Sequence, residues 1–278
     1  MRRHLSFDCC GDTLAGTLDD ALDGSGGKTG ILIISGGNEV RAGAHRGQAR
    51  LAAQLAERGI PVMRYDRRGI GDSEGRNGGF EASADDIKAA LACFRAEAKV
   101  ARVVAFGNCD AATALAMHSQ PSAPDALILS NPWVIEEGGI GHSPKQIRQR
   151  YWAKLRSPRA LWHYVTRGLN LKKLGAGLKA AASNSTAPSG LAERMADGLA
   201  DYEGAIIILL AQGDRTAQQF AERLAEPALA RIAASPRVEV RNYASASHSY
   251  ASEADHDWLV EQLVGAVRTI EGPDKAGV

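Results

Sequence analysis

The sequence is poor in cysteine and aromatic residues and has no long apolar run. Its 278 residues include four cysteines, and 5% are aromatic. Cys9 and Cys10 are adjacent and no two cysteines have C-x-x-C spacing, so we expect neither a disulfide framework nor a metal site. No segment approaches the roughly 18 apolar residues of a membrane-spanning helix, and no apolar stretch follows the basic residues at the start. We therefore expect a cytoplasmic protein.

Charge is nearly balanced over the whole chain but not along it. The formal net charge is +1, and the 45% hydrophobic content supplies a core for one domain with an insertion. Residues 138–192, in contrast, contain ten basic residues and no acidic one. This concentration of positive charge in one segment is the most informative electrostatic feature of the sequence.

Three interpretations of the basic stretch remain open. In the first, it attracts an anionic substrate or carrier, such as a phosphopantetheine-linked acyl group, an acyl carrier protein or an acidic glycan. In the second, it contacts an anionic membrane surface. In the third, it is a solvated lid that packs its aromatic residues on the domain. No nucleic-acid-binding motif accompanies the charge, so we expect no nucleic-acid partner.

Strand and helix patterns alternate along most of the chain. Short apolar runs predict strands, and apolar residues at helical spacing predict helices. The predicted strands cover residues 3–8, 13–19, 30–35, 61–65, 103–106, 126–130, 205–210 and 238–243, and the predicted helices cover 42–58, 81–97, 111–117 and 254–270. This alternation predicts an α/β fold with a mainly parallel central sheet and helices on both faces.

One segment interrupts the alternation. Between Asn131 and Gly204 there is no clear strand, yet helical patterns occur around 144–164 and 169–182. The segment is too long for a loop. We therefore predict a helical cap at residues 132–203, inserted into a core domain of residues 1–131 and 204–278.

The segment Gly107-Asn108-Cys109-Asp110-Ala111 separates a predicted strand from a predicted helix. Its spacing, G-x-nucleophile-x-small, is typical of a nucleophile elbow, in which a sharp turn exposes one side chain above the sheet edge. Gly107 leaves room for the turn and Ala111 keeps the opposite wall small. The nucleophile would be Cys109, where most such enzymes have serine. A buried cysteine without chemistry is the alternative.

An elbow nucleophile needs a base, and the base needs an orienting acid. With elbow nucleophiles the acid and then the histidine follow in chain order. Asp214 follows the strand at 205–210, and His248 follows the strand at 238–243. Alternatively, Asp214 only caps a helix that begins near Thr216, and His248 is an exposed loop residue. The positions of both residues favour catalytic roles.

Acyl transfer also needs hydrogen-bond donors for the oxyanion. We expect these to be the backbone N–H of Asp110 and that of Gly37 or Asn38, just after the strand at 30–35. The glycine is equally compatible with a plain turn. The Asp110 carboxylate would oppose a thiolate at Cys109 unless it turns away to cap the helix.

Basic and aromatic residues near these segments are candidates for substrate binding. Arg41, His45 and Arg46 follow the oxyanion segment, where a carboxylate or phosphate can bind a helix N-terminus, although a solvated helix start fits equally well. Trp133 opens the cap and is a further candidate. The basic pair in the loop 66–73 is interpreted as structural.

In order and spacing, these motifs resemble the α/β-hydrolase superfamily. Finer features are similar to the exosortase A system-associated hydrolase 1 family, whose members have a cysteine nucleophile. The segments that carry this resemblance are SGGNEVRAGAHR, RYDRRGIGDSEG, GNCDAATA, NPW and GDRTAQQF. It covers nearly the whole chain and implies an α/β-hydrolase fold and a setting linked to exopolysaccharide production and sorted surface proteins.

Taken together, the motifs predict a cofactor-independent hydrolase of carboxylic esters or thioesters. Cys109 would attack the acyl carbon, His248 would act as base and then acid, and Asp214 would orient the imidazole. A thioester suits a thiol nucleophile and a carrier-linked acyl group. Two alternatives remain open: an acyltransferase that passes the acyl group to a sugar or another alcohol, and a non-catalytic binding or scaffold protein. A homo-oligomer is compatible with each of these functions.

Overall fold

The computed structural model describes residues 1–21, 29–118, 124–135 and 190–272. The described residues within Met1–Val134 and Gly190–Val278 form one compact unit. The helical patterns predicted at 144–164 and 169–182, together with the basic residues of the stretch 138–192, lie outside the described residues.

The described residues of this unit form an eight-stranded sheet in the order β1-β2-β4-β3-β5-β6-β7-β8. β1 and β2 pair antiparallel, as do β2 and β4, and all other neighbours are parallel. The strands are β1 (Arg2–Cys9), β2 (Asp12–Asp19), β3 (Thr29–Ile34), β4 (Val62–Tyr65), β5 (Arg102–Asn108), β6 (Ala126–Ser130), β7 (Ala205–Ala211) and β8 (Val238–Tyr243). The predicted mainly parallel sheet is confirmed.

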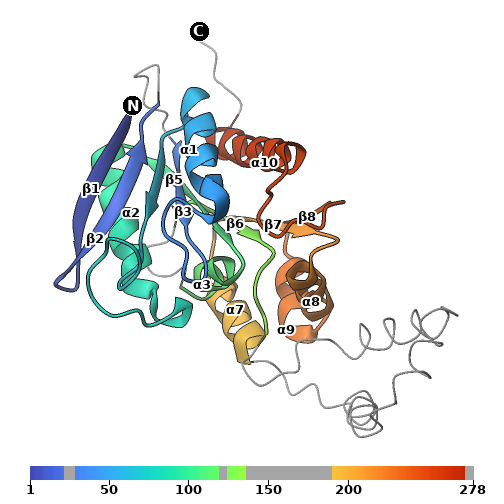
Figure 1. Cartoon of the computed structure of the whole chain (residues 1–278). Helices are drawn as coiled ribbons and strands as arrows, with labels where there is room; N and C mark the ends of the chain where they lie inside the picture. Colours follow the sequence, from blue (N-terminus) through green and yellow to red (C-terminus); the bar gives the residue numbers. More distant parts are fainter. Residues whose placement is uncertain (22–28, 119–123, 136–189, 273–278) are drawn as a thin grey trace, which may run out of the picture. The chain divides into compact units, whose positions relative to one another are not determined.

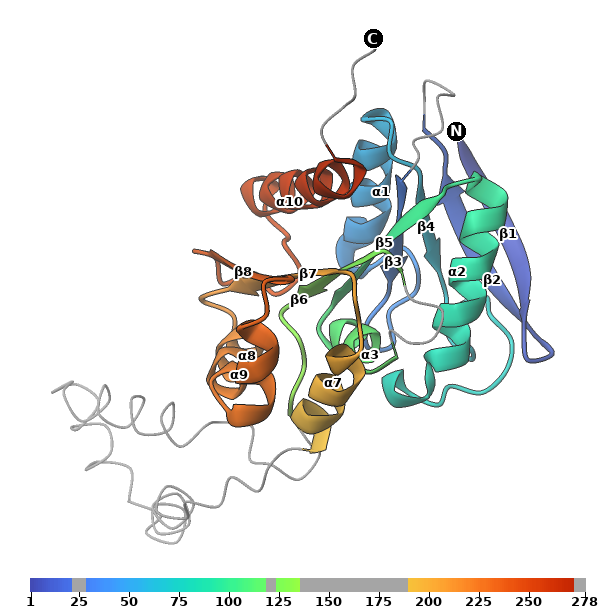
Figure 2. The same ribbon diagram turned by 180° about the vertical axis from the view of Figure 1, so that it is seen from behind.

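Helices cover both faces of the sheet (Figures 1 and 2). One face carries α1 (Gly47–Glu57) and α10 (Glu253–Glu271). The other carries α2 (Ala84–Ala98), α3 (Asp110–His118), α7 (Gly190–Ala200), α8 (Arg215–Leu224) and α9 (Pro227–Ala233). This arrangement agrees with the predicted central sheet covered by helices on both faces.

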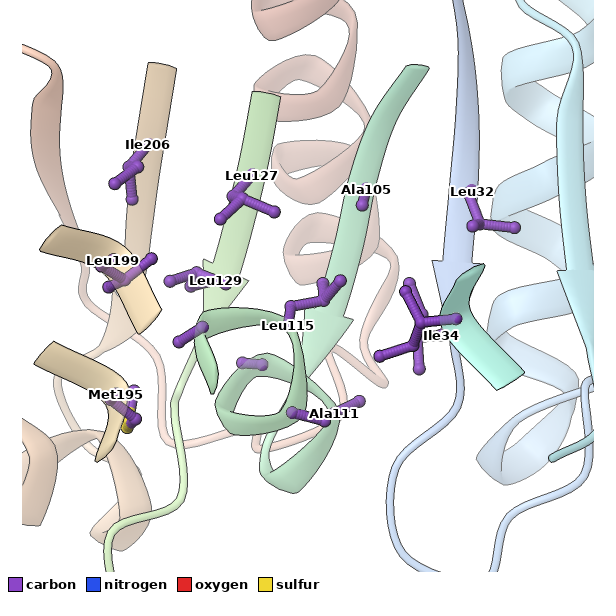
Figure 3. Packing of buried hydrophobic residues seen from close by; sticks show 14 of the residues in the cluster. Leu32, Ile34, Ala105, Ala111, Leu115, Leu127, Leu129, Met195, Leu199 and Ile206 are labelled. Carbon is purple, nitrogen blue, oxygen red and sulfur yellow. The ribbon is translucent and has the colours of Figure 1, made fainter. Parts of the chain in front are cut away.

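The central strands are apolar throughout because both of their faces are buried. Ile31 and Ile33 of β3 pack on the side of α1 and α10, whereas Leu32 and Ile34 pack on the opposite side. Figure 3 shows this second side, where residues of α3 and α7 lie over the strands. The alternation follows directly from the two-residue period of a strand.

Helix α1 starts later than its apolar pattern predicts. The pattern indicated a helix from residue 42, but a short 3-10 turn (Ala44–Arg46) precedes α1. Within this turn His45 and Arg46 have φ angles of 50° and 61°, so the backbone is left-handed there and cannot continue an α-helix.

The chain returns to the core earlier than predicted. The predicted cap extended to residue 203, but α7 belongs to the core unit. Its Met195 and Leu199 are buried against α3 and the sheet (Figure 3). The apolar stripe of α7 matches a core helix as well as a cap helix, so sequence alone did not separate them. Helix α9, which begins with Pro227, had no predicted counterpart.

Of the helices that the structure describes, none is long and apolar enough to span a membrane.

The contact between α3 and the sheet should dominate stability around the elbow. Leu115 of α3 is fully buried in this contact (Figure 3). We expect Leu115→Ala to lower the free energy of unfolding by about 2–5 kcal/mol, because it removes buried methyl groups and leaves a cavity. Urea unfolding measures the loss, and Leu224→Ala, at a partly buried leucine of α8, is the matched control. Equal losses in the two variants would contradict this account.

Candidate active site

Cys109 lies in a sharp turn between β5 and α3. Its φ angle is 62°, a left-handed conformation that residues other than glycine seldom adopt. Its N–H donates to the carbonyl of Ser130 at 2.9 Å, which fixes the turn to β6. A side chain at Gly107 would place its Cβ 2.7 Å from the carbonyl carbon of Ala111, so there is no room for one. The spacing read from the sequence thus reflects a real steric requirement.

The structure brings Asp214 and His248 together. Nδ1 of His248 is 2.9 Å from Oδ2 of Asp214. The same carboxylate oxygen accepts a hydrogen bond from the backbone N–H of Ala217 at 3.1 Å, so Asp214 is also the N-cap of α8. The two interpretations of Asp214 are therefore compatible, because one carboxylate makes both contacts.

The contacts of His248 favour its protonated form. Hydrogen bonds with Asp214 and with Cys109 raise the pKa of His248 to about 10, although burial lowers it. Burial raises the pKa of Asp214, but the hydrogen bond and charge of His248 outweigh burial, so this pKa is lowered overall. At neutral pH the pair is an imidazolium next to a carboxylate.

A polar network holds the loop that carries His248. The side-chain amide of Asn108 donates to the backbone carbonyl of His248 at 3.0 Å. The Asn108 carbonyl oxygen accepts hydrogen bonds from Ser130 at 2.9 Å and Asn131 at 3.2 Å. The hydroxyl of Ser130 is also 2.8 Å from that of Tyr250. The residues on β6 and after it are fully buried, so the network fixes the loop within the core.

Sequence analysis gave these network residues no role. The available signal was their position, because Asn108, Ser130 and Asn131 lie at the carboxyl ends of two neighbouring parallel strands. Backbone strain marks the same place, since Asn131 and Tyr250 have φ angles of 41° and 53°. Such strain is visible only in the structure.

Of the backbone amides predicted to bind an oxyanion, that of Gly37 already has a partner. The N–H of Gly37 donates to Oδ1 of Asp110 at 2.6 Å. A Cβ at Gly36 would lie 2.5 Å from the same oxygen, so only glycine permits the carboxylate this close. The side chain of Asn38 accepts a hydrogen bond from Asn77 at 3.0 Å. The Asp110 carboxylate therefore reaches across to the loop after β3.

The structure does not bear out Arg41 as an anion-binding residue. Its guanidinium donates to the buried carboxylate of Asp66, to Asp72 at 2.8 Å and to Thr17 at 3.0 Å. These partners neutralise the side chain, so its role is to tie the loop after β4 to that after β3. His45 and Arg46 are exposed at the start of α1.

Cys109 and His248 line one cavity of about 180 Å³. Its other lining residues in the described part of the chain are Gly36, Gly37, Glu39, Ala44, Gly47, Gln48, Leu51, Phe106, Asn108, Ser249, Tyr250, His256 and Leu259. Trp133 adjoins the elbow through its backbone, where its N–H donates to the carbonyl of Cys109 at 3.2 Å. His118 lies elsewhere, beside the carbonyl of Glu81. No cluster of potential metal ligands occurs among the described residues.

The sequence profile described as serine aminopeptidase, S33, matches residues 28–255, which is most of the chain. The chain belongs to this family. This S33 family member has cysteine at the elbow position, although the family is named for serine. No curated protein sequence is significantly similar to it.

Solved structures similar to this S33 family member include three enzymes. The esterase Pf2001 of Pyrococcus furiosus is 14% identical with a TM-score of 0.60, and the match covers 95% of this chain and 92% of that one. Proline iminopeptidase of Mycobacterium smegmatis is 12% identical with a TM-score of 0.60, covering 95% and 99%. Est1E of Butyrivibrio proteoclasticus, solved with ferulic acid, is 16% identical with a TM-score of 0.56, covering 94% and 99%.

These similarities confirm the predicted α/β-hydrolase fold. Together with the family match, they identify the S33 family member as a hydrolase. At this level of identity the solved structures do not carry over a substrate.

The Asp214 carboxylate should control the protonation of His248. We expect Asp214→Asn to lower the pKa of His248 from about 10 toward its ordinary value of 6.5, because the variant removes the charge that stabilises the imidazolium. NMR titration of the imidazole carbons measures this shift. His118, whose pKa is lowered by burial, is the internal control and should titrate equally in both proteins. A His248 pKa that is the same in both proteins would contradict the assignment.

Proposed function

We propose that this hydrolase cleaves carboxylic esters or thioesters through Cys109, His248 and Asp214. One observation carries the proposal. A strained left-handed turn places Cys109 in the same cavity as His248, and Oδ2 of Asp214 lies 2.9 Å from Nδ1 of the imidazole. This order of nucleophile, base and orienting acid is the constellation used for acyl transfer on several unrelated folds.

In the proposed reaction the proton of the Cys109 thiol is first transferred to His248, because an adjacent imidazolium favours a thiolate. The Cys109 sulfur attacks the acyl carbon, and the carbonyl electron pair moves to oxygen. As the tetrahedral intermediate collapses, the bond to the leaving alcohol or thiol breaks, and that group takes the proton from His248. His248 then removes a proton from water, which attacks the Cys109 thioester. The carboxylic acid leaves and the sulfur is restored.

The proposal also includes a class of acyl carrier for the substrate and a cellular setting for the enzyme. A carrier-linked acyl group, including one on an acyl carrier protein, matches a thiol nucleophile because thioester exchange between sulfurs is nearly balanced. The motif resemblance to the exosortase A system-associated hydrolases supports a place in an exopolysaccharide-linked set of proteins. Acyl transfer to an alcohol in place of water uses the same acyl-enzyme, and product analysis with alcohol acceptors separates the two outcomes.

Trapping the acyl-enzyme tests the nucleophile. We expect incubation with acyl-thioester and activated-ester panels to add one acyl group to the peptide that contains Cys109, as measured by mass spectrometry. Burial raises the pKa of Cys9 to about 12 and that of Cys93 to about 11, so both should react slowly.

The fourth cysteine, Cys10, is exposed, so the experiment uses a Cys10→Ser background. Cys109→Ala in that background is the matched variant and should lose both the adduct and turnover. An adduct that persists in Cys109→Ala, or turnover that survives it, would overturn the proposed nucleophile.

Asp110 should restrain the reaction, because its carboxylate occupies the Gly37 N–H. Removing one oxyanion donor costs about 10²–10³ in kcat, so freeing this amide in Asp110→Ala should raise kcat by up to that order. Asp110→Asn keeps an acceptor oxygen for Gly37 and should raise kcat less. Steady-state kinetics measures both variants. A lower kcat in Asp110→Ala, with the fold intact by circular dichroism, would show that the carboxylate assists the reaction.

A further inference from the structure

A second pocket lies beside the loop that carries Gly37. Its volume is about 150 Å³, and in the described residues its lining is Arg67, Arg68, Arg76, Asn77, Gly78, Gly79, Ala82 and Asp86. Three arginines therefore line this pocket together with a short glycine-rich segment. None of the steps proposed above uses this pocket.

Its charges are only partly balanced. Asp86 accepts hydrogen bonds from the backbone N–H of Arg68 at 2.9 Å and from its Nε at 2.5 Å. The exposed carboxylate of Asp85 is 3.7 Å from the same guanidinium. Arg68 is thereby neutralised. Within the described part of the chain, neither Arg67 nor Arg76 has a carboxylate at ion-pair distance, so the pocket keeps an excess of positive charge.

The two unneutralised arginines differ in solvent exposure. Arg67 is 5% exposed, and its guanidinium donates to the backbone carbonyl of Gly37. Arg76 is exposed at the rim of the pocket. A buried arginine fixed by a backbone carbonyl, together with a free one at the rim, forms a geometry that suits a carboxylate or phosphate.

Two hydrogen bonds connect residues that line the pocket to the loop after β3. Arg67 holds the carbonyl of Gly37, and Asn77 donates to the side chain of Asn38 at 3.0 Å. The N–H of Gly37 in turn reaches Asp110, the neighbour of Cys109. The loop after β3 lines the candidate active site and is held by hydrogen bonds from Arg67 and Asn77, two residues that line the second pocket.

We propose that this pocket binds an anionic group of the substrate, either a phosphate on the leaving group or a carboxylate on the acyl group. The inference rests on the proposed acyl-transfer function for its role in turnover, but binding of the anion itself does not require turnover. The interpretation of the arginine pair in the loop 66–73 as structural holds for Arg68, whereas Arg67 supports the loop at Gly37 and also keeps its positive charge.

The test uses Arg76→Gln, because Arg67 supports the loop at Gly37. Two substrate pairs separate the two anions: butyryl thioesters of 4′-phosphopantetheine and of pantetheine, and succinyl and butyryl thioesters of pantetheine. We expect the variant to raise KM about tenfold for the anionic member of one pair. This is the effect expected from the loss of one charge-assisted hydrogen bond. The neutral members and kcat should not change.

Arg50→Gln is the matched control, since it removes one exposed arginine from α1, outside the pocket. A tenfold effect in the phosphate pair identifies a phosphate site, and one in the succinyl pair identifies a carboxylate site. Equal effects of both variants, or no effect in either pair, would overturn the proposal, because general electrostatic attraction would then be sufficient.

A binding measurement separates this inference from the proposed function. Inorganic phosphate and malonate are titrated into the full-length Cys109→Ala protein by calorimetry, with and without Arg76→Gln. Binding of either anion that weakens with Arg76→Gln supports the pocket even if no ester or thioester is ever cleaved. Turnover by the wild-type protein without any such binding would support the proposed function and overturn the pocket.

Discussion

The close contact between Gly107 and the first turn of α3 is the constraint on which the site depends. Because Gly107 has no side chain, α3 can begin directly after β5 and Cys109 is forced into a left-handed turn. The buried apolar face of α3 compensates for that strain by packing on the sheet. Packing in the core thereby stabilises a turn that leaves Cys109 partly accessible at the sheet edge.

Sequence patterns located the fold and the reacting groups because those features depend on local rules. Apolar runs identified the central strands, and the five-residue elbow placed Cys109. Asp214 and His248 were found from chain order, and the structure joins them across 34 positions of sequence. The boundary of α7 and the left-handed turn at His45 escaped detection, since tertiary packing and backbone strain decided both.

Side-chain pairing was the least predictable part of the site. Arg41 looked available for an anion, but Asp66 and Asp72 neutralise it. Arg67 looked structural, yet its one described bond is to a carbonyl and leaves its charge unbalanced. Sequence gives the number of charges in a loop, whereas only three-dimensional contacts show which of them are compensated. The same limit applied to Asp110, whose carboxylate reaches Gly37 across 73 positions.

The bond from Asn108 to the carbonyl of His248 has a mechanical consequence. β8 is one of the two edge strands of the described sheet, and all of its residues are partly or fully exposed, so its end is a poor anchor for a precisely placed imidazole. Asn108 precedes Cys109 at the end of the central strand β5, and its side chain holds the loop that carries His248 through this hydrogen bond. The position of the imidazole relative to the sulfur therefore depends on this bond to the residue before Cys109 as well as on the outer strand.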